Sequence, residues 1–111
     1  MSQSVLAYLQ ADGARSFVAE MDGELAGFCS YVIDNARKRG TVGYNGVARR
    51  HQGMGIGSTM LDFVMSRIRA EGMEYAAVIV ADNEEHAPAR GNYEKHGFRK
   101  LMGLHYMVQK L

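Results

Sequence analysis

The alternation of apolar and polar residues near the start of the chain predicts two strands joined by a tight turn. Residues Arg15–Met21 place apolar side chains on one face of an extended segment, and a second extended run, Glu24–Asp34, follows. The dipeptide Asp22–Gly23 between them is typical of a two-residue β-hairpin turn. Gly27, inside the second run, indicates either a β-bulge or a close backbone approach.

Two segments flank this hairpin. Residues Ser2–Asp12, with Gly13 behind them, are interpreted as the last turns of a short helix closed by a glycine. Residues Asn35–Gly40 are interpreted as a solvated loop because they contain the basic run Arg37–Arg39. A phosphate-binding patch is the alternative interpretation of that run.

The middle of the chain predicts a glycine-rich strand and an amphipathic helix. Residues Thr41–Ala48 form the strand, and Gly43 and Gly46 weaken its packing, which a close approach by a ligand or another backbone would explain. Apolar residues then recur every four positions over Ile56–Ile68, so we expect a helix that ends near Gly72.

The last third predicts a buried strand followed by a helix and two strands. Residues Tyr75–Ala81 are almost unbroken in apolar character, as a strand buried on both faces would be. Strand, helix and buried strand form a βαβ crossover, which implies parallel pairing. We expect a helix over Pro88–His96 and strands over Phe98–Leu101 and Leu104–Val108. The fold class is therefore α/β or α+β, with a mixed sheet and few helices.

Length and composition limit the classes of protein that need to be considered. The 111 residues predict a single domain, 1–111, and a net charge of +1 gives no global field that would attract nucleic acid or an anionic membrane. The first 25 residues lack the pattern of a signal peptide, and no apolar run approaches the roughly 18 residues of a membrane span. We therefore expect a cytoplasmic protein. The single cysteine, Cys29, excludes an internal disulfide and is interpreted as a small core residue rather than a nucleophile.

Residues Val47–Ser58 carry the strongest indication of chemistry. They run from an apolar segment through basic residues and alternating glycines into the helical pattern. The glycines permit positive φ angles, and the N–H groups and dipole of a helix start favour an anion. We interpret the loop as a cradle for phosphate or pyrophosphate. A P-loop requires a lysine before Ser58, where Gly57 stands, and the spacing fits a dinucleotide fingerprint poorly. A purely structural glycine loop remains the alternative.

Two motifs resemble those of the GNAT superfamily of N-acetyltransferases. The order Gln-x-x-Gly-x-Gly over Gln52–Gly57 resembles the acetyl-CoA signature of that family, and Ala89–Phe98 resembles its second motif, which ends Tyr-Glu-Lys-x-Gly-Phe. The resemblance covers roughly Arg15 to the C-terminus, and the helical N-terminal region usual in the family is mostly absent. The chain thus resembles a shortened member of the family.

The resemblance implies a twisted, mostly antiparallel sheet with a central parallel βαβ crossover. It also implies a V-shaped opening between the strands Thr41–Ala48 and Tyr75–Ala81, in which the pantetheine arm of acetyl-CoA lies. Arg49, Arg50 or His51 would reach the nucleotide phosphates as charge-assisted donors, and solvated loop charge is the alternative interpretation of each. The residues implied to bind acetyl-CoA are Val47, Ala48, Arg49, Gln52, Gly53, Met54, Gly55, Ile56, Gly57, Ser58, Asn83 and His86.

The expected reaction is transfer of the acetyl group to a primary amine of a small molecule or peptide by direct attack in a ternary complex. The resemblance implies the backbone N–H of Val47 as the donor to the carbonyl oxygen and Tyr93 as the general acid for the leaving thiolate. The strand before the glycine loop carries no acid or histidine, so the general base is unassigned. The candidates that act through water are Glu84, Glu85, His86 and His105.

Two other functions stay open at this stage. The missing strand carboxylate and N-terminal helices also suit a non-catalytic acyl-CoA-binding or regulatory module. A nucleotide-binding fragment of another class is the third hypothesis. We expect no metal site, and we expect a homodimer because a shortened chain leaves apolar surface that a partner can cover.

Overall fold

The computed structural model describes residues 3–11 and 14–111, with side chains described from Arg15 onward. Its contacts divide the chain into two compact units, the first ending at Ile79 and the second comprising Val80–Leu111. The expectation of one domain over the whole chain stays a prediction.

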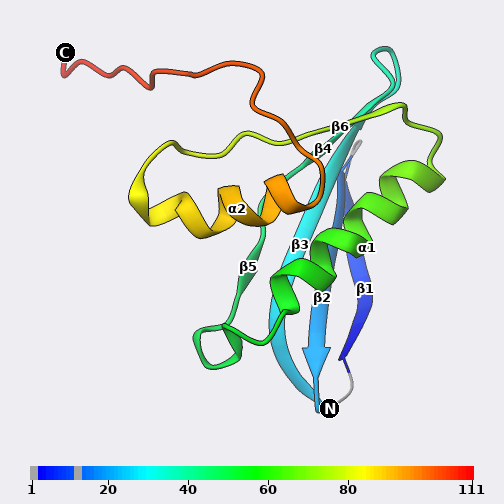
Figure 1. Ribbon diagram of the computed structural model, residues 1–111. Coiled ribbons are helices and arrows are strands. Elements are labelled where there is room, and N and C mark those ends of the chain that lie inside the picture. Colours follow the sequence, from blue (N-terminus) through cyan, green and yellow to red (C-terminus); the bar gives the residue numbers. More distant parts are fainter. Residues whose placement is uncertain (1–2, 12–13) are drawn as a thin grey trace. The chain divides into compact units, whose positions relative to one another are not determined.

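The first unit is built on a six-stranded mixed sheet (Figure 1). Its strands are β1 (Gln3–Ala11), β2 (Ala14–Met21), β3 (Glu24–Asp34), β4 (Arg39–Val42), β5 (Gly46–Val47) and β6 (Tyr75–Ala77). The order is β1-β2-β3-β4-β6, with β5 paired to β3. The β4–β6 pair is parallel and the other pairs are antiparallel. The expected fold class, with its central parallel crossover, is confirmed.

The hairpin between β2 and β3 forms as the sequence predicts. Asp22 and Gly23 have positive φ angles of 52° and 81°, which matches the backbone of a type I′ turn. A register shift lies between Ala19 and Glu20, and a Cβ added to Gly27 would stand 2.6 Å from the carbonyl oxygen of Gly46. Both features expected around Gly27, a bulge and a close backbone approach, are present.

Helix α1 (Ile56–Ala70) packs on one face of this sheet (Figure 1). Its buried side chains are Ile56, Met60, Leu61, Val64 and Ile68, the stripe that the spacing of apolar residues predicts. Phe17 on β2 stacks on Tyr31 of β3 and meets the Phe63 ring edge to face at 4.9 Å between centroids. Burial of each large apolar side chain contributes about 1.5–3 kcal/mol, so this layer holds the unit together.

A polar cluster ties the end of α1 to the sheet. The fully buried Tyr31 donates its hydroxyl to Glu71, and the Arg15 guanidinium lies 3.0 Å from the other carboxylate oxygen of Glu71. Burial raises the pKa of Tyr31, and its hydrogen bond to Glu71 raises it further. The phenol therefore stays protonated at neutral pH and donates its hydrogen bond to the Glu71 carboxylate.

The expected helix over Ser2–Asp12 is wrong for the residues that the structure describes. Residues Gln3–Ala11 form β1, antiparallel to β2. The rest of that prediction, Ser2, Asp12 and Gly13, falls outside the described residues. A nine-residue segment is too short to hold a helix by itself. The open edge of β2 offers it a full row of backbone partners instead.

Two strand predictions in this unit need correction. The single strand expected over Thr41–Ala48 is two strands, because the backbone between Val42 and Gly46 leaves the ladder. The strand expected over Tyr75–Ala81 ends at Ala77, and Ile79 is 78% exposed. The apolar run predicts a strand that is buried on both faces. In the described sheet β6 pairs with β4 along one edge, and its other edge is unpaired.

The second unit contains the short helix η2 (Glu84–His86) and α2 (Ala87–Lys95). The expected helix over Pro88–His96 is confirmed within one residue at each end, and Gly97 ends it with a φ of 93°. The strands expected over Phe98–Leu101 and Leu104–Val108 are wrong, since the structure gives this stretch no regular secondary structure. A two-stranded hairpin is marginal without further strands, which explains why the strand-forming composition is not sufficient here.

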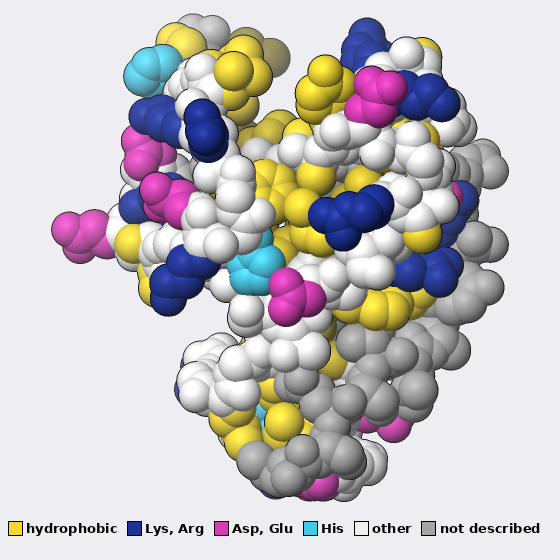
Figure 2. Space-filling model, turned by 45° about the vertical axis from the view of Figure 1, so that its right-hand side comes forward, with side chains coloured by type: hydrophobic (Ala, Val, Ile, Leu, Met, Phe, Trp, Pro, Cys, Tyr) yellow, Lys and Arg dark blue, Asp and Glu magenta, His cyan; other side chains and the backbone are white. Residues whose placement is uncertain are grey.

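The described surface carries charges of both signs. On the face shown in Figure 2, Lys and Arg side chains are interspersed with Asp and Glu rather than gathered into one patch. Within residues 3–11 and 14–111, the helices are too short or too polar for any of them to cross a lipid bilayer.

Candidate functional site

A β-bulge opens the sheet between β4 and β5. The N–H of Gly43 donates to the carbonyl of Ser30, and Gly46 then pairs with Phe28. From Ser30 to Phe28, β3 advances two residues, whereas the facing chain advances three from Gly43 to Gly46. The extra residue bends the strand and changes the direction of its backbone. Because β6 pairs with β4 but not with β5, the outer edge of β5 is left open in the described sheet.

The direction of the backbone N–H and C=O groups determines which of them are available at the open edge of β5. The N–H of Ala48 donates to the carbonyl of Ala26 at 2.7 Å, so Ala48 faces β3. Successive residues of a strand alternate in this respect, and the N–H and carbonyl of Val47 therefore point away from β3. The Gln52 side chain already donates to the Val47 carbonyl at 3.2 Å. Val47 and the first residue of the glycine motif are thus in direct contact.

The glycine loop leads from this edge into α1. Gly53 and Gly55 have φ angles of 78° and 81°, and a Cβ added to either would meet nothing within 4 Å. Gly55 is the N-cap of α1 and supplies no side-chain cap to it. The first intrahelical bond is from the N–H of Thr59 to Gly55 at 3.0 Å, so the N–H groups of the preceding turn point out of the helix end. This combination suits an anion.

The short helix η1 (Arg49–His51) joins β5 to the glycine loop. Glu24 lies 3.3 Å from the Arg50 guanidinium and 3.4 Å from Nε2 of His51. The His51 contact is at ion-pair distance without hydrogen-bond geometry. Of the three basic residues, Arg50 and His51 are thus engaged by one carboxylate, while Arg49 is exposed. Arg50 is exposed as well, and that any of these three residues meets a phosphate stays a prediction.

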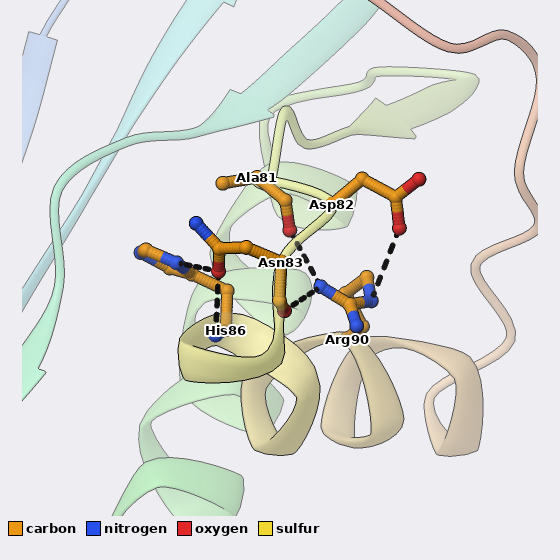
Figure 3. A network of polar contacts seen from close by, with 5 residues as sticks. All are labelled: Ala81, Asp82, Asn83, His86 and Arg90. Atoms are coloured by element: carbon orange, nitrogen blue, oxygen red, sulfur yellow. Dashed lines mark hydrogen bonds and ion pairs between the residues drawn. The ribbon is translucent and has the colours of Figure 1, made fainter.

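In the second unit, Asn83 and His86 form one compact turn (Figure 3). The Asn83 side-chain oxygen accepts from the His86 backbone N–H at 2.9 Å and lies 2.7 Å from Nδ1 of the same residue. Arg90 fixes the chain from the other side, because it donates to the carbonyls of Ala81 and Asn83 at 2.7 and 2.6 Å. Asn83 and His86, both expected to bind acetyl-CoA, are therefore held together.

Tyr93 lies on α2, where its side chain is 9% exposed. Its ring meets Phe98 edge to face at 5.7 Å between centroids. Tyr93 belongs to the second unit and Val47 to the first, and each unit is described by itself. That the two residues act on one reacting centre stays a prediction. The candidate bases Glu84, Glu85, His86 and His105 are all exposed side chains of the second unit.

Cys29 does not offer a nucleophile. The side chain is 2% exposed, and burial raises the pKa of its thiol to about 11. The reactive form of cysteine is the thiolate, which is scarce at neutral pH when the pKa is this high. Its role as a small core residue agrees with its place beneath α1.

Two features of this site cannot be predicted from the sequence. The bulge after Gly43 needs the register of three strands to be known, although the glycines that flank it, Gly43 and Gly46, are a signal in the sequence. The contact of Glu24 with Arg50 joins residues 26 positions apart, and no local pattern marks it.

Comparison with known proteins shows which family this chain resembles. A model of the acetyltransferase (GNAT) family matches residues 2–98. No curated protein sequence matches the chain. Among solved structures, nourseothricin acetyltransferase shares 31% identity, with 77% of this chain and 49% of that one covered and a TM-score of 0.66. An IAA acetyltransferase from Bacillus cereus shares 23% identity over 81% of this chain and 58% of that one, with a TM-score of 0.73.

A third structure is AAC(6')-Iy in complex with the bisubstrate analog CoA-S-monomethyl-acetylneamine. It shares 18% identity over 94% of this chain and 74% of that one, with a TM-score of 0.75. The chain spans about half the length of the first two structures that it matches. With a family match over nearly the whole sequence, a bulged strand and a glycine loop at a helix start, the chain belongs to the GNAT family of acetyltransferases.

Proposed function

We propose that this protein binds acetyl-CoA and transfers its acetyl group to a primary amine by direct attack in a ternary complex. The observation that carries the proposal is the continuous path from the open edge of β5 through Gln52 to the uncapped start of α1. An extended, amide-bearing pantetheine arm suits an open strand edge, and a diphosphate suits the end of a helix.

The loop offers backbone donors rather than a basic pocket for the diphosphate. Gly53 and Gly55 adopt positive φ, and open space surrounds the position of a Cβ at each. A ligand can therefore approach the main chain closely. A helix N-terminus contributes roughly 0.3–1 kcal/mol to a nearby anion at an exposed site, so several N–H groups must act together. Arg49 adds a charge at the entrance to the loop.

The chemistry requires an electrophile, a stabilised oxyanion and a proton for the leaving group. The Val47 N–H, which points away from β3, is the proposed donor to the thioester carbonyl oxygen. A thiol titrates near 8.5 and a phenol near 10, so a tyrosine can donate its proton to the departing thiolate without a large energy gap. Tyr93 is the proposed acid. The incoming ammonium must lose its proton before it attacks. The general base stays unassigned, and the candidates that act through water are Glu84, Glu85, His86 and His105.

The family match supports the reaction class, and one of the structures that share this fold was solved with a CoA analog. That structure, AAC(6')-Iy, was solved with an analog in which CoA is joined to an acetylated amine. The likeness lies below 25% identity and supports the fold alone. The family match adds acetyl transfer as the reaction class.

Replacement of Tyr93 tests the assignment of the acid. Tyr93→Phe should lower kcat by 10-fold or more, because general acid catalysis typically contributes a factor of about 100 to 10,000. The affinity for CoA, measured by calorimetry, should stay within twofold. Tyr75→Phe, at an exposed tyrosine on β6, is the matched control and should change neither quantity. Full turnover by Tyr93→Phe at every pH would remove Tyr93 from the mechanism.

A non-catalytic acyl-CoA-binding module is the second candidate. The observation that favours it is the lack of any carboxylate or histidine over Arg39–Val47, the stretch that forms β4 and β5. Both candidates bind CoA, so thermal stabilisation by CoA does not separate them. Release of free thiol from acetyl-CoA in the presence of an amine panel does, since only an acetyltransferase gives a signal.

We also propose that the protein is a homodimer. Large apolar side chains at residues 101–111 are exposed, among them Leu101 at 90% and Tyr106 at 93%. Apolar side chains exposed in this number suit an interface that a partner covers. Light scattering at micromolar concentration should give twice the mass of 12.3 kDa, and a monomeric mass would refute the dimer.

A further inference from the structure

A small apolar pocket lies on the face of the sheet opposite α1. It has a volume of about 240 Å³, and its lining residues are Leu25, Gly27, Phe28, Gly46, Val47 and Ala48. None of them carries a titratable side chain. The pocket belongs entirely to the first unit, and its wall includes the bulged strand at Val47.

The register of the sheet fixes the side on which the pocket opens. Phe17 and Cys29 are paired across β2 and β3 and are buried on the side of α1. Phe28, the next residue along β3, therefore points to the other face, as does its partner Gly46. A Cβ added to Gly46 would stand 3.0 Å from the Phe28 ring, so the absence of a side chain there keeps the pocket open.

The proposed acetyl-CoA site and the apolar pocket lie on opposite faces of the sheet. The Val47 side chain lies on the side of α1, since a Cβ added to Gly57 would stand 3.8 Å from its Cγ2 atom. The diphosphate site at the start of α1 is therefore on the helix side, and the apolar pocket opens on the opposite side of the same strand. An acceptor can therefore approach the thioester at Val47 from the pocket side while acetyl-CoA stays bound.

We propose that the pocket holds the apolar body of the acceptor, so that the preferred acceptor is a primary amine carried on a single ring or a short alkyl chain. This inference rests on the proposed acetyl transfer and names its substrate class. A cavity of about 150 Å³ lined by apolar side chains is sufficient for benzene. This pocket is open to solvent rather than enclosed, and its volume of about 240 Å³ matches the size of one ring with a two-carbon arm.

The charges near the pocket disfavour a polycationic acceptor. Glu24, the carboxylate adjacent to Leu25 in sequence, is engaged by Arg50 and His51. A polyamine would bring several ammonium groups to a wall of apolar atoms, and desolvation of each would oppose binding. An arylalkylamine brings one ammonium, which must lose its proton for the reaction in any case.

The test compares phenethylamine with spermidine and ethanolamine as acceptors for the intact chain. Thiol release should give phenethylamine a kcat/KM at least 10-fold above that of either polar amine. Phe28→Ala should raise the KM for phenethylamine by at least fivefold and leave the calorimetric affinity for CoA within twofold. Val32→Ala is the matched control, because Val32 is 46% exposed on the same strand, against 48% for Phe28, and does not line the pocket.

A second readout is independent of turnover. In the presence of CoA, phenethylamine should shift the backbone amide resonances of Leu25, Phe28 and Ala48. Such shifts without turnover of any amine would support the pocket and refute the proposed transfer. Turnover of spermidine at equal or higher efficiency, unaffected by Phe28→Ala, would overturn the inference and leave the transfer standing. Absence of both turnover and shifts would overturn both.

Discussion

Substitution of Gly55 by alanine tests the glycine loop, and the chain supplies its own control. Gly55 precedes α1 with a φ of 81°, and Gly72 follows the same helix with a φ of 84°. A Cβ at either position would meet nothing within 4 Å. The two substitutions therefore impose the same conformational strain, without steric overlap, at opposite ends of one helix.

The expected loss of stability follows from that strain. A residue other than glycine in the left-handed region costs about 1–2 kcal/mol. Since the Cβ has open space around it, no further term is added, and both variants should lose about the same stability. For a domain near 100 residues this corresponds to a decrease in Tm of roughly 4–8 °C per kcal/mol.

The two variants should differ in their affinity for CoA. The methyl group of Gly55→Ala occupies the space next to the first-turn N–H groups, where the diphosphate is proposed to lie, so Kd should rise at least 10-fold. Gly72→Ala should bind CoA as the unmodified protein does, when calorimetry is performed well below either Tm. Equal affinities in the two variants would refute the claim that the loop contacts the carrier.

Two further predictions concern stability. Because the pKa of Tyr31 is raised in the folded state by burial, its contribution is complete below the unfolded value near 10 and is lost as pH rises through the folded pKa. Chemical denaturation should show stability falling above pH 10, and Tyr31→Phe should flatten that decline while it costs about 1 kcal/mol at neutral pH. A fall of equal steepness in both proteins would contradict the assignment. Gly91→Ala on α2 should gain about 0.5–1 kcal/mol, because open space surrounds the new methyl group, and a loss in thermal scans would contradict it.

The sequence predicts those elements whose formation depends on local pattern. The β2–β3 hairpin follows from Asp22–Gly23 between two extended runs, and α1 follows from apolar residues at every fourth position. The same kind of pattern predicts strands after α2, and these strands do not form in the described chain. A strand requires a partner edge as well as a suitable composition, and the sequence around Leu104 does not specify that edge.

The same distinction applies to the site. The glycine loop can be predicted from the sequence because the positive φ angles at Gly53 and Gly55 strongly favour glycine. The bulge that opens the edge of β5 depends on the register between β3 and the chain after Gly43, a relation between distant segments. The helix expected over Ser2–Asp12 fails for the same reason, since the free edge of β2 determines the conformation of the residues that pair with it.

The most direct test of the account is a titration of the labelled protein with CoA, followed by the backbone amide resonances. The largest shifts should fall on the loop residues Gln52–Ser58 and on Val47, because their N–H groups are proposed to meet the diphosphate and the pantetheine arm. Saturation by CoA with these resonances unmoved, or no binding at millimolar CoA, would contradict the central claim.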